Sequence, residues 1–223
     1  MLTIEELEFC YPASDFTMRI AQMRIATGSR LALVGPSGVG KSTLLNLFAG
    51  ILTPRRGVVR VGDVSLSTLS DQQRRAWRLR HVGYVFQDFA LLDYLSVRQN
   101  IVLPYYLGSH GKLQSSWNDE LDAMVHRLGI AATLDRSVEA LSQGQRQRVA
   151  VARALALRPE IVLADEPSGN LDEATMRDVM ATMFAYQEET KATLVVVTHD
   201  LPLRSLFQQE VDIRDVMVPG ESS

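Results

Sequence analysis

The chain has little cysteine, no excess of basic residues and no long apolar run, and each of these shortages excludes a class of protein. Its one cysteine, Cys10, cannot form an intrachain disulfide and is typical of a reducing compartment. The net charge of −3 argues against a dedicated nucleic-acid binder, which usually carries a strong basic excess. Apolar runs such as residues 192–197 have the length of a strand, whereas a membrane span needs about 18 residues. Because Glu5, Glu6 and Glu8 interrupt the N-terminus, we also expect no secretory signal, and a soluble, intracellular chain without a nucleic-acid partner.

The segment Gly35–Ser42 reads Gly-Pro-Ser-Gly-Val-Gly-Lys-Ser and matches the phosphate-binding pattern G-x-x-x-x-G-K-[ST] at every fixed position. It follows the apolar run Leu31–Val34, which predicts a buried strand, and precedes residues 43–49, which predict a helix that ends at a glycine. The glycines let the backbone aim its N–H groups inward, and the helix N-terminus adds partial positive charge. The pattern predicts that Lys41 reaches the β- and γ-phosphates and that Ser42 ligates Mg²⁺, so the chain binds a nucleoside triphosphate.

Short apolar strands alternate with helical segments over the 223 residues, a length that suits one large domain. This alternation predicts an α/β fold, in which a phosphate-loop NTPase core has a mostly parallel sheet covered on both faces and an N-terminal antiparallel β subdomain. Residues 88–140 read as helices and loops, and we expect a helical subdomain inserted between core segments 1–87 and 141–223. The predicted strands are residues 2–9, 16–25, 31–34, 57–62, 82–86, 161–163 and 193–197, and the predicted helices are 43–49, one that begins after Ser70, 147–157 and 173–189, followed by a short final helix and strand.

Polar residues follow three of the predicted strands, at the carboxyl ends where ligands gather in open α/β sheets. Asp165 and Glu166 follow one strand, His199 follows a second and Gln87 follows a third. Beside a phosphate loop, Asp165 is the expected acid of the Mg²⁺ shell, and Glu166 can orient and polarise the attacking water. Gln87 can contact the metal or that water. His199 can hydrogen-bond the γ-phosphate, although a hydrogen-bonded histidine in a turn explains the same residue.

The segment Leu141–Gln145 reads Leu-Ser-Gln-Gly-Gln and opens a predicted helix. Ser142 as N-cap, with Gln145 three residues later, forms a capping box. The same hydroxyl and the N–H groups of the first turn also form a second anion site at a helix N-terminus. One chain has no use for two such sites on one phosphate tail, unless the second serves the nucleotide of another subunit.

These motifs together resemble the nucleotide-binding subunit of an ABC transporter, and the resemblance spans almost the whole chain, from Tyr11 to His199. The short Asn170-Leu171-Asp172 form of the loop after the acids, and residues 96–101, are similar to the lipoprotein-release and macrolide-export group. That group also includes a cell-division ATPase that signals through a permease partner. The resemblance rests on the family's order and approximate spacing of the phosphate loop, Gln87, Leu141–Gln145, Asp165-Glu166, Ser168–Asp172 and His199.

The resemblance implies a role for each matching residue, with ATP and Mg²⁺ as cofactors. It implies that Gln143, which stands where the family signature usually has glycine, alters the tuning of the site and leaves the function intact. The implied phosphate-binding residues are Gly35, Ser37, Gly38, Gly40, Lys41, Ser42 and Thr43. The other implied roles are adenine stacking by Tyr11, metal sensing and permease coupling by Gln87, capping of the opposite subunit's γ-phosphate by Ser142 and Gly144, the Mg²⁺ shell for Asp165, the catalytic base for Glu166, an interface role for Asp172 and a γ-phosphate contact for His199.

The implied partners are a second ATPase chain and a membrane permease. Two identical or related chains are expected to close head to tail around two Mg·ATP, so that each site is half-built in a monomer. The permease, which is not in this chain, would hold the ATPase on the cytoplasmic face of the bacterial inner membrane. The segment from Phe89 to Tyr94, which includes Leu91 and Leu92, is a candidate docking surface for the permease, or else part of the subdomain core.

Three alternative functions can be compared with that of a transporter ATPase. An ATPase that regulates envelope or cell-wall enzymes through a permease-like complex, without transport, would use the same motifs. A soluble ABC ATPase of DNA repair or translation usually carries a coiled coil, zinc modules or two fused cassettes, which this chain lacks. A phosphate-loop kinase is disfavoured, because the Leu141–Gln145 segment and the paired acids would have no function in it. The sequence does not identify the transported molecule or the direction of transport.

The helix predicted after Ser70 carries the basic residues Arg74, Arg75 and Arg78, with Trp77 among them. This basic cluster is interpreted as a solvated helix face, with anionic lipid or a partner protein as the alternative. Trp77 is interpreted as a packing residue.

Overall fold

A computed structural model describes the chain apart from residues 13, 109–114, 170 and 219–223. Its strands are β1 (Leu2–Cys10), β2 (Thr17–Ile25), β3 (Arg30–Val34), β4 (Arg56–Val61), β5 (Val64–Ser65), β6 (Val82–Val85), β7 (Ile161–Asp165), β8 (Thr193–Val197) and β9 (Gln209–Asp212). Its α-helices are α1 (Lys41–Phe48), α2 (Asp71–His81), α3 (Val97–Leu107), α4 (Ser115–Arg127), α5 (Gln143–Leu155), α6 (Glu173–Thr190), α7 (Leu201–Arg204) and α8 (Ile213–Val216). Short 3₁₀ turns lie at Leu66–Thr68, Ala131–Thr133 and Val138–Ala140.

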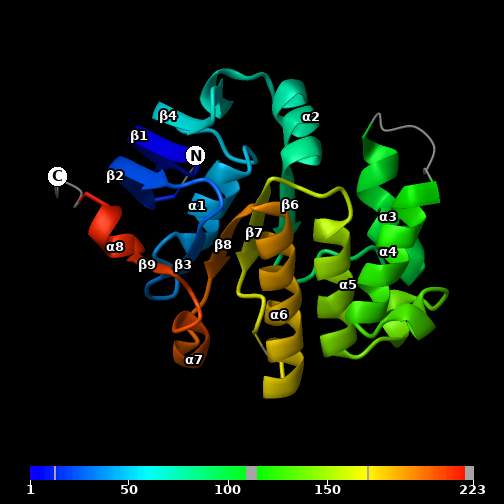
Figure 1. Cartoon of the computed structure of the whole chain (residues 1–223). Coiled ribbons are helices and arrows are strands. Elements are labelled where there is room, and N and C mark those ends of the chain that lie inside the picture. The colour runs from blue at the N-terminus through cyan, green and yellow to red at the C-terminus, as the bar shows by residue number, and fades with distance from the viewer. Residues whose placement is uncertain (13, 109–114, 170, 219–223) are drawn as a thin grey trace.

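The strands form two sheets, as predicted (Figure 1). The N-terminal sheet has the order β2-β1-β4-β5, and all of its neighbours run antiparallel. The second sheet has the order β6-β7-β8-β3-β9, and all of its neighbours run parallel. The carboxyl ends of β3, β6, β7 and β8 therefore meet at one edge of this sheet, which is where the phosphate loop begins.

Both faces of the parallel sheet are buried, which explains why its strands are continuously apolar. In β7, Ile161 and Leu163 pack on the face that α1 and the antiparallel sheet cover. The alternate residues Val162 and Ala164 pack on the opposite face, against α5 and α6. Helix α1 thus lies between the two sheets, and Phe48 of this helix is fully buried there.

The segment between β6 and α5 contains α3, α4 and two 3₁₀ turns, and it extends the core that α5 covers. Figure 1 shows α5 between α6 and the α3–α4 pair. Leu121, Val125 and Leu128 of the predicted helical stripe are buried, and Met124 is partly buried against them. The assignment of residues 88–140 to a separate subdomain remains a prediction. No helix within the described residues combines the length and the apolarity that a membrane crossing requires.

The predicted bounds of two helices were wrong by two to four residues, and one short helix was not predicted. Helix α1 begins at Lys41, directly after left-handed Gly40, two residues before the predicted start. Helix α5 begins at Gln143, because the capping box of Ser142 fixes the first turn immediately after the N-cap, and it ends at Leu155, two residues before the predicted end. The C-terminal region contains a second short helix, α8, after the expected helix and strand.

Two arginines of the basic helix α2 form hydrogen bonds to backbone carbonyl oxygens of other segments. Its predicted capping box of Ser70 and Gln73 is present. Arg78 donates to the carbonyl oxygens of Ala49 and Gly50 at the end of α1, and burial together with the charge of Arg75 lowers the pKa of Arg78. Arg74 donates to Leu69 O, whereas Arg75 is exposed and pairs with Asp71. Trp77 packs on the core, as predicted.

Candidate nucleotide-binding site

One cavity of about 530 Å³ lies at the carboxyl edge of the parallel sheet. Segments from four parts of the chain line it: the connection between β1 and β2, the phosphate loop with the first turn of α1, Gln87 two residues after β6, and Glu166 directly after β7. Its lining residues are Tyr11, Ser14, Phe16, Ser37, Gly38, Gly40, Lys41, Ser42, Thr43, Gln87 and Glu166. Eight of these eleven were predicted to contact nucleotide or metal, and a ninth, Glu166, was predicted as the catalytic base; the fold brings them together.

The phosphate loop has a backbone that only glycine adopts easily. Gly38 and Gly40 have φ values of 78° and 110°, in the region that side chains with a Cβ rarely occupy. A Cβ at Gly40 would also lie 2.6 Å from Met18 Cε and 2.7 Å from Phe16 Cζ. Gly40 is the N-cap of α1, and no side chain caps this helix. The first turn of α1 therefore keeps its N–H groups available for an anion.

Lys41 lies across the phosphate loop and is buried. Its Nζ donates to Gly35 O and to Pro36 O, at 2.9 Å each. These two carbonyl oxygens hold an ammonium group at the mouth of the loop. A phosphate oxygen is a stronger acceptor for a cation than a carbonyl oxygen, so the same group can turn to a phosphate bound in the cavity.

Tyr11, which directly follows β1, lines the same cavity as Gln87 and Glu166. Its hydroxyl group lies 3.0 Å from Thr43 Oγ1, which ties the turn after β1 to the first turn of α1. Its ring meets Phe9 edge to face at 4.8 Å and lies 5.8 Å from the ring of Phe16. The aromatic surface of Tyr11 and Phe16 is thus fixed beside the phosphate loop.

Asp165 is a buried carboxyl group that lacks one partner. The residue is 7% exposed, and its Oδ1 atom has no hydrogen-bond partner within the described structure. Burial raises the pKa of Asp165, and a hydrogen bond with Ser42 partly opposes this effect. The pKa of Tyr84 is raised by burial and by the nearby charge of Asp165. A cation between Ser42 and Asp165 would satisfy the free oxygen, so these two residues fit a Mg²⁺ ion.

Mg²⁺ needs few protein ligands when phosphate oxygens and waters supply the others. In keeping with this, the described residues contain no group of three or more His, Cys, Asp or Glu side chains arranged to hold a metal.

Glu166 and His199 meet at the ends of β7 and β8. His199 Nδ1 lies 3.5 Å from Glu166 Oε2, with the carboxylate largely buried and the imidazole largely exposed. Glu166 has a φ of 47°, and its N–H group donates to Val197 O at 3.0 Å. This left-handed backbone turns the Glu166 side chain into the cavity. A carboxylate held in this way can accept a proton from a water molecule beside the phosphate tail.

Ser142 and Gly144 are outside the lining of this cavity. Ser142 Oγ accepts from Gln145 N at 3.3 Å, and the Ser142 N–H group donates to Gln145 Oε1 at 3.0 Å, which completes the predicted capping box. Ser142 and Gln143 are exposed. A Cβ at Gly144 would lie 3.0 Å from Thr175 Cγ2 of α6, so glycine permits close packing of α5 and α6 here.

Asp172 caps helix α6, and its neighbour Asn170 is outside the described residues. Its Oδ1 accepts from Thr175 N at 2.9 Å, and hydrogen bonds from Thr175 lower the pKa of Asp172. Asp172 is exposed, and its predicted role at a dimer interface remains a prediction.

Sequence reasoning missed several residues at and near this site. Ser14 and Phe16 line the cavity, although the sequence indicated only a turn and a strand there; the aromatic ring five residues after Tyr11 was the available signal. Arg153 was also missed: its guanidinium donates to the carbonyl oxygens of Phe89 and Ala90, just after Gln87. Nothing in the local sequence marks this contact, because it joins α5 to a loop more than sixty residues earlier.

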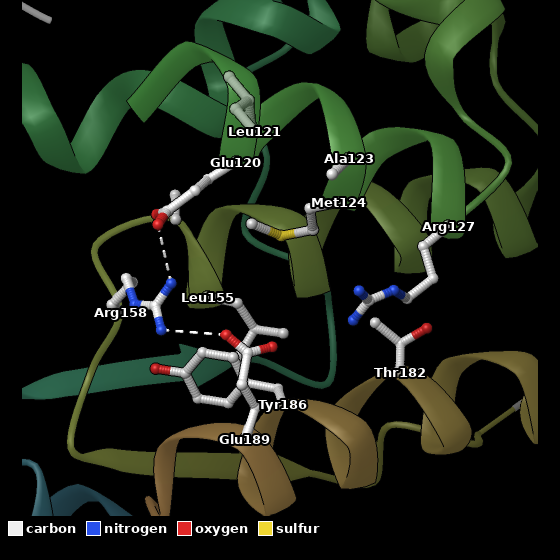
Figure 2. Close-up of a pocket in the computed structure, with 11 residues that line it drawn as sticks. Glu120, Leu121, Ala123, Met124, Arg127, Leu155, Arg158, Thr182, Tyr186 and Glu189 are labelled. Atoms are coloured by element: carbon white, nitrogen blue, oxygen red, sulfur yellow. Dashed lines mark hydrogen bonds and ion pairs between the residues drawn. The ribbon is translucent and has the colours of Figure 1, made fainter. Parts of the chain in front are cut away.

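A second cavity, of about 200 Å³, lies between α4, the end of α5 and α6. Figure 2 shows Arg158 between two acids of different helices, Glu120 of α4 and Glu189 of α6. The two ion pairs measure 3.0 Å and 3.1 Å. The apolar floor is made by Leu121, Met124 and Leu155. This cavity contains none of the residues predicted for nucleotide or metal.

Comparisons with known proteins agree with these motifs. Residues 18–169 match the family described as ABC transporter. The chain is 36% identical over 203 residues to the lipoprotein-releasing system ATP-binding protein LolD of Legionella pneumophila, which covers 90% of this chain and 88% of LolD. It is also 36% identical over 205 residues to the macrolide export ATP-binding/permease protein MacB of Syntrophobacter fumaroxidans; this alignment covers 92% of the chain but 29% of the longer MacB. The resemblance to the lipoprotein-release and macrolide-export group is confirmed.

A solved structure shares the fold. The ATP-binding cassette MJ0796, a dimer in a post-hydrolysis state bound to ADP and Pi, superposes with a TM-score of 0.86. The two chains are 29% identical, and the superposition covers 96% of this chain and 95% of that one. Family, relatives and fold agree: the chain belongs to the ABC transporter family and is an ATP-binding, ATP-hydrolysing subunit of that family.

Proposed function

We propose that this ATPase works as a head-to-tail dimer that closes on two Mg·ATP and thereby drives a separate membrane permease. The observation that carries the proposal is the division of the predicted site within one chain. Tyr11, Lys41 and Glu166 line one cavity, whereas Ser142 is exposed on α5 outside it. A second chain can supply the missing Ser142. The dimeric state of the related cassette MJ0796 supports this arrangement.

Each residue of the cavity has a distinct task in this proposal. Lys41 and the uncapped first turn of α1 bind the β- and γ-phosphates, and Tyr11 stacks on the adenine. Ser42 and Asp165 hold the Mg²⁺ ion, with Gln87 as a further ligand or sensor of the metal. When bound there, Mg²⁺ would neutralise charge on the phosphate oxygens.

Glu166 accepts a proton from the attacking water, and His199 contacts the γ-phosphate from the end of β8. Ser142, the backbone near Gly144 and Asp172 act across the interface, on the nucleotide of the other chain. Charge-assisted hydrogen bonds contribute about 1.5–3 kcal/mol each, so a few of them decide between the closed and the open dimer. Hydrolysis and loss of phosphate remove these bonds, and the dimer opens.

The permease is proposed to dock beside Gln87 and to hold the ATPase on the cytoplasmic face of the membrane. Tyr94, seven residues after Gln87, is 82% exposed and is available for this contact. Leu91 is partly buried against the core of the helical region, so it supports the proposed docking surface from below and is less available for contact with the permease. The names of the relatives, the lipoprotein-releasing LolD and the macrolide export protein MacB, support an assembly that releases a lipoprotein or exports a macrolide.

Glu166→Gln tests the catalytic proposal. The amide cannot accept the proton of water, so hydrolysis is expected to fall about 10²- to 10⁴-fold. ATP binding should persist, and the closed dimer should accumulate in size-exclusion chromatography with ATP and Mg²⁺. Glu160→Gln, at the opposite end of β7, is the matched control and should hydrolyse ATP at the wild-type rate. Normal turnover by Glu166→Gln would remove Glu166 from this role.

A further inference from the structure

The loop that follows Gln87 has an unusual backbone. Phe89 and Ala90 are consecutive residues with φ values of 64° and 47°, although neither is glycine. Residues with a Cβ are rarely left-handed, and such conformations persist only where surrounding contacts hold them. The loop has no regular secondary structure between β6 and α3. Contacts from outside the loop must therefore hold Phe89 and Ala90 in this conformation.

Arg153 of helix α5 supplies the contacts at these two residues. Its Nη2 donates to Phe89 O at 2.6 Å, and its Nη1 donates to Ala90 O at 2.5 Å. The residue is 8% exposed, and its guanidinium forms no ion pair within the described residues. Burial lowers the pKa of Arg153 to about 10, an effect that the charge of Asp88 opposes. A buried guanidinium is costly unless it is fully hydrogen-bonded, so both carbonyl oxygens must face it.

The other end of the loop is fixed by a second buried polar side chain. Asn100 of α3 is fully buried, and its Oδ1 atom accepts from Leu92 N at 2.8 Å. Its Nδ2 donates to the carbonyl oxygens of Leu92 and Leu95. The segment between Gln87 and α3 is thus held by Arg153 near Gln87 and by Asn100 near α3. Of these two side chains, Arg153 holds the residues that directly follow Asp88.

We propose that Arg153 is a positioning residue for Gln87: its two hydrogen bonds keep Phe89 and Ala90 left-handed and so direct Gln87 into the nucleotide cavity. The inference rests on the proposed role of Gln87 at the metal or the water. Arg153 itself touches neither nucleotide nor metal in this account, because it contacts only the loop backbone. Its removal should therefore affect the chemical step and leave the affinity for ATP unchanged.

The test compares Arg153→Met with Arg78→Met in the full chain. Both arginines donate to two consecutive carbonyl oxygens, but those of Arg78 lie at the end of α1. We expect Arg153→Met to accelerate hydrogen exchange of the amides of residues 88–91, to lower kcat about ten- to hundredfold and to leave KM for ATP unchanged. Arg78→Met should lower the melting temperature without changing exchange in residues 88–91.

A second substitution asks whether backbone strain is the cause. Glycine adopts a positive φ without a steric cost, so Ala90→Gly added to Arg153→Met should restore part of kcat and slow the exchange again. Arg153→Lys, which keeps the charge but not the fork of donors, serves if Arg153→Met does not fold, and should show the same changes at smaller size.

Two results would overturn the proposal. The first is unchanged exchange in residues 88–91, and the second is accelerated exchange with unchanged kcat. Failure of the underlying role of Gln87 is separately visible, because Gln87→Ala in a chain that keeps Arg153 would then leave kcat unchanged.

Discussion

Two helix N-termini of this chain can receive an anion, and they differ in how they are capped. Helix α1 follows left-handed Gly40, and no side chain caps it. Helix α5 follows Ser142, which forms a reciprocal capping box with Gln145. In α1 the first N–H groups stay available for phosphate, whereas in α5 two of the backbone and side-chain donors already have partners.

This difference indicates when each helix end becomes a binding site. The α1 end is surrounded by the turn after β1, Gln87 and Glu166, so a single folded chain already presents a cavity there. The α5 end is stable without a ligand and is exposed, so it becomes a site only when a nucleotide is brought to it. We propose that the nucleotide on a second chain does so. Substitutions at one helix end at a time separate these two roles, and a substitution of Asp165 at the end of β7 tests the metal site beside the α1 end.

The largest expected effect comes from Ser142→Arg. The bulky cation replaces the hydroxyl that is proposed to meet the other chain's γ-phosphate. Loss of two charge-assisted hydrogen bonds of about 1.5 kcal/mol or more each should weaken ATP-driven dimerisation at least about 100-fold. ATP binding to the monomer, measured by fluorescence titration, should be unchanged.

The control for this substitution is Ser70→Arg. It removes the same kind of capping box from α2, since Ser70 pairs with Gln73 as Ser142 pairs with Gln145. Both variants should lose about 1 kcal/mol of stability, but Ser70→Arg should dimerise normally. Loss of ATP binding to the Ser142→Arg monomer would place this segment in the site of its own chain.

A smaller effect is expected at the α1 end from Gly40→Ala. Alanine would have to adopt the φ of 110° that Gly40 has, and its Cβ would push against Phe16 and Met18. We expect a loss of about 2 kcal/mol in urea denaturation, together with weaker ATP binding as Phe16 shifts. Gly38→Ala is the matched control, because nothing lies within 4 Å of its Cβ, and it should lose about 1 kcal/mol. Equal losses in the two variants would contradict the role given to Phe16 and Met18.

The smallest effect is a gain of stability from Asp165→Asn. Burial raises the pKa of Asp165 above its ordinary value of 3.8, so the folded chain binds this proton more tightly than the unfolded chain. The contribution of Asp165 to stability is therefore most favourable below that ordinary value and is lost as the pH rises through the raised pKa. At pH 7 with a chelator, the variant should be more stable than wild type by about 1 kcal/mol in urea.

The advantage of Asp165→Asn should shrink as the pH is lowered toward the ordinary value of the carboxyl group. Added Mg²⁺ and ATP should reverse the order, because the amide is a poorer ligand for the metal. A variant that is less stable than wild type at pH 7 with the chelator would contradict the account of Asp165 as a buried, incompletely paired charge.

The parts of the fold that depend on local chemistry were predictable from the sequence. The phosphate loop, the boxes at Ser70 and Ser142 and the continuous apolar strands each have their signal within a few residues. The parallel pairing of the core strands was predicted from their continuous apolarity, but the order of the strands was not, because no local signal sets which strands are neighbours. The gathering of Gln87 and Glu166 beside the phosphate loop followed from the rule that carboxyl strand ends share one edge.

The parts that depend on distant contacts were not predictable. Arg153 contacts Phe89 and Ala90 only because α5 packs beside the loop after β6. The left-handed backbone of Glu166 is likewise set by its hydrogen bond to Val197 on the neighbouring strand. A charged residue in a helix pattern, such as Arg153, indicates a solvated face unless the three-dimensional neighbours are known. The two ion pairs of Arg158 could not be predicted for the same reason, because Glu120 and Glu189 are distant in the sequence.

The most direct test of the dimer proposal is the hydrolysis rate per chain across a dilution series of the wild-type protein with saturating Mg·ATP. If each chain supplies half of every site, the rate per chain must fall as dilution separates the chains. Restoring the concentration must restore the rate. A rate per chain that stays constant when light scattering shows only monomers would contradict the account.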